Sequence, residues 1–146
     1  GWRLGYGIFP KSIFKYAEQL AINCHSCVSI PHQIAGIEAL NGDQSSVNSM
    51  IDEFKVRRDF LVKELNLIKN ISCVKPGGAF YVFPKIFKDS FSSNKISNFL
   101  LEEKFIATVP GSSFGENGEG YLRISYANQM NRLKKFIELI RQFMNE

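Results

Sequence analysis

The sequence has no long hydrophobic run and little cysteine. Its apolar residues stand in short groups, none close to the ~20 consecutive apolar residues of a membrane-spanning helix. Its first residues show no succession of basic, apolar and small residues of the kind that forms a secretory signal. We therefore expect a cytoplasmic protein that does not associate with a membrane.

The three cysteines, Cys24, Cys27 and Cys73, form an odd set at irregular spacing. This argues against a disulfide framework and predicts reduced, partly buried thiols. The run Cys24-His25-Ser26-Cys27 does place two thiols and an imidazole together, and a structural zinc ion needs four such ligands. Only His32 and Cys73 remain as further candidates, so a Cys/His metal module is an alternative that predicts stoichiometric zinc.

The chain also lacks a concentration of positive charge. The net charge is +4, but lysine and arginine are scattered, and the doublets Arg57-Arg58 and Lys134-Lys135 have acidic residues nearby. Nucleic-acid binding favours a basic stripe interleaved with aromatic residues. Because no such stripe is present, we expect no nucleic-acid partner.

What the 146 residues do have is material for a core, with 45% hydrophobic and 13% aromatic residues. Apolar periodicity predicts helices after Pro10, from Pro31 to Asn41, from Ser45 to about Ile68, around residues 96–103, and from about Asn128, which could be the N-cap. Shorter patterns predict strands at residues 4–9, 72–74, 79–83, 105–109 and 121–125. The result is an α+β fold, a small and mainly antiparallel sheet with helices packed on one face.

Two arginines interrupt apolar patterns. Arg58 lies on the apolar face of a long helix, where we expect it to reach solvent or to pair with an acid from another element. Arg123 lies in a run that otherwise predicts a buried strand. A guanidinium keeps its charge and fits a carboxylate with two parallel hydrogen bonds. The partner of Arg123 is either an acid of the chain itself, in a structural ion pair, or the carboxylate of a ligand.

Four segments in order carry a resemblance: Gly1-Trp2-Arg3-Leu4-Gly5-Tyr6-Gly7, Pro76-Gly77-Gly78-Ala79-Phe80-Tyr81, Pro110-Gly111-Ser112-Ser113-Phe114-Gly115 and Gly120-Tyr121-Leu122-Arg123-Ile124-Ser125-Tyr126-Ala127. Together they resemble the C-terminal part of a class I aminotransferase, a pyridoxal-phosphate (PLP) enzyme of the aspartate aminotransferase fold type. The resemblance covers essentially the whole chain. It implies that residues 1–42 are a remnant, with a strand and helices, of the large α/β cofactor domain. Residues 43–146 would be the small domain, including the long linking helix.

The resemblance also implies roles for the two arginines of these segments. Arg3 would bind the cofactor phosphate, and Arg123 would bind the α-carboxylate of the amino-acid substrate. The lysine that forms the Schiff base with the cofactor lies upstream of the Gly-Trp-Arg motif in this family, hence before Gly1. We therefore expect a fragment of a homodimeric enzyme acting on amino acids and 2-oxo acids, and we expect the chain to be inactive alone.

Further expectations concern the surroundings of the site. By resemblance, Gly111–Gly115 forms a loop near the substrate, although a plain turn fits the residues equally well. Aromatic residues in strands usually pack, so Phe80, Tyr81 and Phe114 are expected in the core rather than at the substrate. A non-catalytic α+β domain that binds a small carboxylate or a partner chain through the Arg123 region is the alternative function.

If the chain is a fragment, apolar side chains near its start should be exposed, with Leu4, Ile8, Phe14 and Ile34 as candidates.

Overall fold

The computed structural model describes residues 1–88 and 91–145. The chain divides into two compact units, Gly1–Ser46 and Val47–Glu146. Within the described residues, no helix combines the length and apolar character that crossing a membrane requires.

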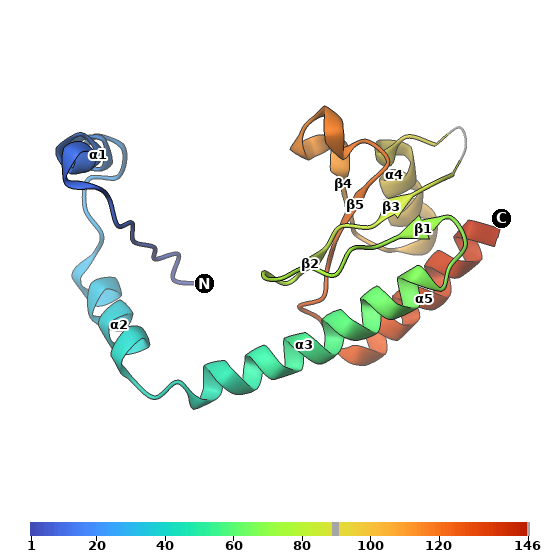
Figure 1. Cartoon of the computed structure of the whole chain (residues 1–146), viewed down its shortest axis with the longest axis horizontal. Helices are drawn as coiled ribbons and strands as arrows, with labels where there is room; N and C mark the ends of the chain where they lie inside the picture. The colour runs from blue at the N-terminus through green and yellow to red at the C-terminus, as the bar shows by residue number, and fades with distance from the viewer. Residues whose placement is uncertain (89–90, 146) are drawn as a thin grey trace. The chain divides into compact units, whose positions relative to one another are not determined.

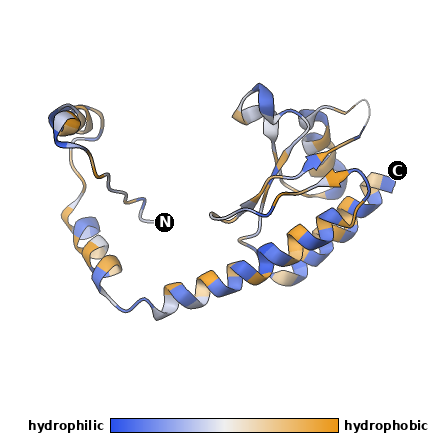
Figure 2. Cartoon of the chain, viewed as in Figure 1, coloured by the Kyte–Doolittle hydropathy of each residue, from blue (hydrophilic) through white to orange (hydrophobic). Residues whose placement is uncertain are grey.

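The first unit contains two helices, α1 (Lys11–His25) and α2 (Ile30–Asn41), labelled in Figure 1. Pro10 directly precedes α1, and Pro31 lies in the first turn of α2, where the fixed φ of proline suits a helix. Neither helix has a buried residue. Figure 2 shows hydrophobic and hydrophilic residues alternating along α2. The expected exposure of Leu4, Ile8, Phe14 and Ile34 is confirmed.

The strand predicted at residues 4–9 is wrong. The structure describes all of residues 1–46, and none of them forms a strand. A strand needs a neighbour for its backbone hydrogen bonds, and this unit offers only helices. Leu4 instead lies against α2 at Gly36, where a β-carbon would collide with the leucine side chain.

The second unit combines three helices with short antiparallel strands. The helices are α3 (Ser45–Asn66), α4 (Ser93–Lys104) and α5 (Met130–Asn145). One sheet pairs β1 (Ile71–Ser72) with β3 (Lys85–Ile86), and the other has the order β2-β5-β4, from β2 (Tyr81–Val82), β5 (Leu122–Ser125) and β4 (Val109–Pro110). Two 3₁₀ turns, η1 (Gly111–Phe114) and η2 (Glu116–Gly118), connect β4 to β5. The predicted α+β fold is confirmed.

Several boundaries differ from the prediction by a few residues, and two of them illustrate the cause. Residues 105–109 form a strand only at Val109, because Phe105 has φ +56° and ends α4 in a left-handed cap, with the Ile106 N–H donating to the Leu100 carbonyl at 2.8 Å. Helix α5 begins at Met130 rather than near Asn128, whose side chain accepts a hydrogen bond from the adjacent Gln129 N–H, at 2.9 Å.

The core lies between the helices and one face of the sheets. Helices α3, α4 and α5 contribute residues to a single buried cluster together with alternate strand residues. Its most completely buried members are Leu61, Leu65, Val82, Ile96, Leu100, Leu122, Tyr126, Ile140 and Phe143. The opposite face of the sheet is left for other contacts.

Candidate functional site

Arg123 lies in the central strand of the three-stranded sheet. β5 pairs with β4 on one side, where Arg123 is opposite Val109, and with β2 on the other. Along β5 the buried residues alternate with accessible ones: Leu122 and Ile124 join the core, and Arg123 between them is half-buried. Because side chains alternate across a strand, Arg123 points to the opposite side of the sheet from the core.

We call this surface the open face. Its aromatic residues contact one another: the rings of Phe83 and Tyr121 stack at 5.1 Å, and the Phe83 ring meets the Phe114 ring edge to face at 5.9 Å. The open face consists of Tyr81, Phe83, Phe114, Tyr121 and Arg123.

The guanidinium of Arg123 lies over two of these rings. Its central carbon is 4.5 Å from the centre of the Tyr81 ring and 5.1 Å from the centre of the Phe114 ring. The face of an aromatic ring attracts a cation electrostatically at such distances.

The expectation that Phe80, Tyr81 and Phe114 belong to the core is wrong. Phe80 and Phe114 are 40% and 55% exposed, and Tyr81 is half-buried. In β2 only Val82 points inward, so its neighbour Tyr81 points to the open face.

Arg123 makes no ion pair with any acidic side chain in residues 1–88 and 91–145. The six ion pairs recorded there all join other residues. The structural ion pair considered as one alternative is therefore not found among the described residues. A permanent cation, half-buried against aromatic rings and with free donors, is suited to bind a carboxylate from a ligand.

The turn that carries Phe114 is closed by two glycines. A β-carbon on Gly111 would collide with the Gly118 carbonyl oxygen, and one on Gly118 with the Gly111 carbonyl oxygen, both well under 3.0 Å. The Gly111 N–H also donates to the Tyr121 carbonyl at 2.7 Å. The two ends of the turn thus approach so closely that only glycine fits at either position.

A polar network attaches the same turn to α4. Buried Ser93, the first residue of α4, donates its backbone N–H and its hydroxyl to the Glu119 carboxylate at 2.6 and 2.9 Å. The Ser93 and Ser112 hydroxyls are 3.0 Å apart. The Ser93 N–H, followed by its hydroxyl, lowers the pKa of Glu119. Sequence reasoning missed Glu119, because it lies 26 residues from Ser93 and no local motif connects them.

Arg3 lies in the first unit and is exposed, with φ +57°. It lines a hollow of about 410 Å³ together with Trp2, His32 and Gly36. The Trp2 and His32 rings meet edge to face at 4.9 Å. No acid in the described part of the chain forms an ion pair with Arg3, so its donors are accessible.

Arg58 forms an ion pair, but not with the expected partner. Its partner is the adjacent Asp59 on the same helix, at 2.8 Å, rather than an acid from another element. Its long-range contact is a weak hydrogen bond, 3.4 Å, to the Pro76 carbonyl. Hydrogen bonds from Arg58 and then Lys75 lower the pKa of Asp59 to about 2. Adjacent residues such as Arg58 and Asp59 point in different directions from a helix, but the arginine side chain is long enough to bend back to its neighbour.

The cysteines are only partly as expected. Cys24 and Cys27 are exposed and Cys73 is buried, and all three are free thiols. Burial raises the pKa of the Cys73 thiol to about 11. Among the described residues, no group of three or more His, Cys, Asp or Glu side chains is arranged to hold a metal ion.

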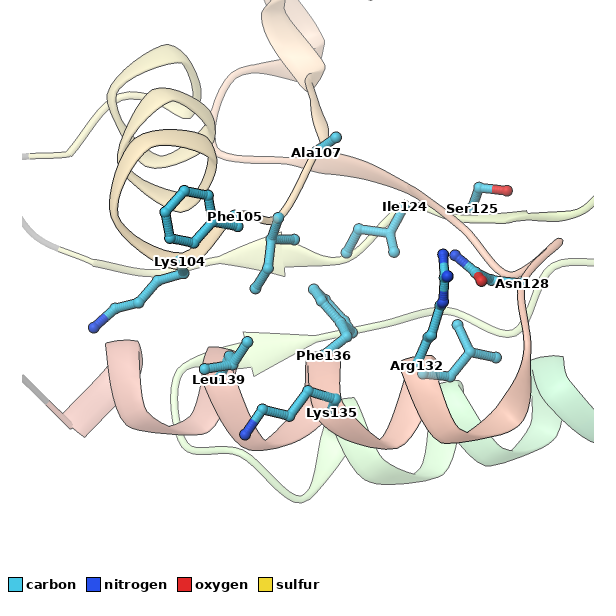
Figure 3. Close-up of a pocket in the computed structure, with 12 residues that line it drawn as sticks. Lys104, Phe105, Ala107, Ile124, Ser125, Asn128, Arg132, Lys135, Phe136 and Leu139 are labelled. Atoms are coloured by element: carbon cyan, nitrogen blue, oxygen red, sulfur yellow. The ribbon is translucent and has the colours of Figure 1, made fainter.

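A separate hollow of about 510 Å³ lies between α5 and the segment that follows α4. Figure 3 shows Phe136 and Leu139 of α5 along it, with the charged groups of Lys104 and Lys135 at one end. Neither Arg3 nor Arg123 lines it. The open face, where a cation with free donors meets aromatic rings, is the better candidate site.

Comparison with known proteins identifies the family. The family model for class I and II aminotransferases matches residues 1–140. The chain belongs to this family. An aspartate aminotransferase from Pyrococcus horikoshii is 42% identical over an alignment of 147 positions that covers 94% of this chain. Aminotransferases of this family use PLP.

Solved aminotransferase structures have the same fold. An aromatic aminotransferase from Pyrococcus horikoshii matches 99% of the chain with a TM-score of 0.88 and 36% identity. An aspartate aminotransferase from Thermotoga maritima matches 99% with a TM-score of 0.86 and 34% identity. The chain spans 38% of the length of the curated Pyrococcus relative, and 39% and 36% of the two solved structures.

Proposed function

We propose that these residues belong to a PLP-dependent aminotransferase that transfers amino groups between amino acids and 2-oxo acids, with Arg123 as the residue that binds the substrate α-carboxylate. Membership of the aminotransferase family supports the activity. The observation that carries the assignment of Arg123 is that its guanidinium is half-buried on the open face without an acidic partner among the described residues. A bound carboxylate would satisfy this charge with two hydrogen bonds.

Arg3 is the proposed ligand of the cofactor phosphate. It fits that group in charge and in access, since its guanidinium is exposed beside a hollow and forms no ion pair with a described acid. PLP, when bound, supplies the aldehyde and the conjugated ring that transamination requires. In this proposal, Arg3 anchors the cofactor through its phosphate, and Arg123 orients the substrate through its α-carboxylate.

The remaining parts of the proposal follow from the family. Residues 1–42 would belong to the large cofactor-binding domain and residues 43–146 to the small domain, close to the division of the chain after Ser46. By resemblance, the lysine that binds the cofactor covalently is not one of the lysines of this chain. The 146 residues alone should then be inactive, while the whole protein should be a cytoplasmic homodimer.

The test uses the full-length protein that contains these residues. It should transfer the amino group of at least one common amino acid to a 2-oxo acid, and only when loaded with PLP. Arg123→Gln should abolish most of this activity, because an amide cannot replace the charge. Arg132→Gln is the matched control, an exposed arginine of α5 away from the open face.

Absence of transfer by the wild-type protein with every donor would refute the activity. Carboxylate binding without transfer would favour the non-catalytic alternative. Equal activity of the Arg123 and Arg132 variants would refute the assignment of Arg123 alone.

A further inference from the structure

Two aromatic rings reach the guanidinium of Arg123 from different elements. Tyr81 belongs to β2, which pairs with one edge of β5. Phe114 belongs to η1, which directly follows β4 on the other edge. Arg123 is thus contacted by side chains from both sides of its strand.

Phe114 is poorly explained as a core residue. Phe114 is 55% exposed and its aromatic neighbour Phe83 is 38% exposed. An apolar ring left this accessible contributes little by burial. What its position does provide is an edge-to-face contact with the Phe83 ring, at 5.9 Å, and a contact with the cation of Arg123, at 5.1 Å.

The position of Phe114 is fixed by its surroundings. Gly111 and Gly118 close the turn by a backbone contact that no larger residue could make. Ser112, two residues before Phe114, is 3.0 Å from the hydroxyl of buried Ser93, which is also bound to Glu119. The Phe114 ring therefore belongs to a turn whose two ends are packed against each other and which is hydrogen-bonded to α4.

We propose that Phe114 and Tyr81 are positioning residues for Arg123, which hold its guanidinium by the ring faces and leave its N–H edge free for a carboxylate. The proposal rests on the function proposed above. An arginine that stacks on aromatic rings keeps its donors in the plane of the guanidinium, where a carboxylate can meet them. Holding a flexible side chain in its bound orientation also reduces the entropy that binding would otherwise lose.

The test measures steady-state kinetics of the full-length, PLP-loaded enzyme. Phe114→Leu removes the ring but keeps an apolar side chain, and should lower kcat/KM about tenfold, mainly through a higher KM for the amino acid. Phe114→Tyr keeps the ring and should restore wild-type values. Phe87→Leu is the matched control, because Phe87 is similarly exposed and lies beneath Lys85 instead of Arg123.

A double-mutant cycle separates positioning from a general structural effect. If Phe114 acts through Arg123, adding Phe114→Leu to Arg123→Lys should reduce kcat/KM much less than it does in the wild type. Full additivity, or a loss in Phe87→Leu equal to that in Phe114→Leu, would overturn the proposal. Should Phe114→Leu fail to fold, Tyr81→Leu goes through the same cycle with the same criteria. An inactive wild-type enzyme would instead overturn the proposed function, and this inference with it.

Discussion

Replacing Gly118 by alanine tests whether the turn beneath Phe114 is closed as tightly as the structure indicates. The new β-carbon would meet the carbonyl oxygen and the carbonyl carbon of Gly111, the carbon at 2.6 Å. Both are backbone atoms, so no side-chain rotation relieves the collision. The chain must separate at the point where Gly111 donates to Tyr121 and where Ser112 contacts Ser93.

The expected loss of stability follows from the kind of collision. Forcing an extra carbon into a closely packed site costs typically about 1–3 kcal/mol. In a unit of about 100 residues, each kcal/mol lowers the melting temperature by roughly 4–8 °C. Gly118→Ala should therefore lower the melting temperature of the chain by roughly 4–24 °C, measured by circular dichroism or calorimetry.

Gly77→Ala is the matched control for this measurement. A β-carbon on Gly77 would meet nothing within 4 Å, and Gly77 is not among the residues with positive φ. Where the backbone is compatible, alanine in place of glycine stabilises by about 0.4–1 kcal/mol through the unfolded state. Equal melting temperatures for the two variants would refute the close approach of Gly111 and Gly118, and with it the rigid placement of Phe114.

Three further predictions concern charge and chemistry. In the full-length enzyme, Arg123→Lys should lower kcat/KM by a factor equivalent to about 2–5 kcal/mol of transition-state stabilisation, with little change in PLP affinity. Arg3→Ala should instead weaken PLP binding first. A lower melting temperature of Arg123→Lys with intact kcat/KM would contradict the role of Arg123. After treatment of the 146-residue chain with PLP and borohydride, mass spectrometry should find scattered lysines labelled in low yield. Quantitative labelling of one lysine would contradict the proposal that the cofactor lysine is not among the lysines of this chain. Because the folded pKa of Glu119 is lowered, its stabilisation is present above its unfolded pKa, about 4.5, and is lost as pH falls. Melting curves of Glu119→Gln should thus depend less on pH below about 5 than those of the wild type, and parallel curves would refute the Ser93 contact.

The helices could be predicted because each carries its own periodic signal. The apolar spacing of α5, from Leu133 to Phe143, identifies both the helix and its buried face. The resemblance similarly pointed to Arg123, and the alternation along β5 places that side chain outside the core. The local sequence pattern was sufficient to predict those elements whose side chains pack into the common hydrophobic core.

Other features depend on partners distant in the sequence. The strand predicted at residues 4–9 is absent because a strand requires a neighbour, which the first unit does not contain. The two-residue strand β3 was missed because it is too short to show a period. The network of Glu119, Ser93 and Ser112 joins residues up to 26 positions apart, and hydroxyl and carboxylate side chains in loops give no local sign of such contacts.

The open face has a simple origin in the alternation of one segment. Between residues 81 and 87, Val82, Pro84 and Ile86 are buried, whereas the residues between them are accessible. Had the accessible positions been polar, this side of the sheet would be an ordinary solvated surface. Three of them are instead aromatic, Tyr81, Phe83 and Phe87, and the fourth is the cation Lys85. Arg123 stands in the neighbouring strand β5. Rings that gain little from burial here are arranged around cations, with Arg123 over Tyr81 and Lys85 over Phe87. Of these two cations, only Arg123 also lies over the Phe114 ring of the turn that is hydrogen-bonded to α4, and this makes it the one whose orientation the fold controls.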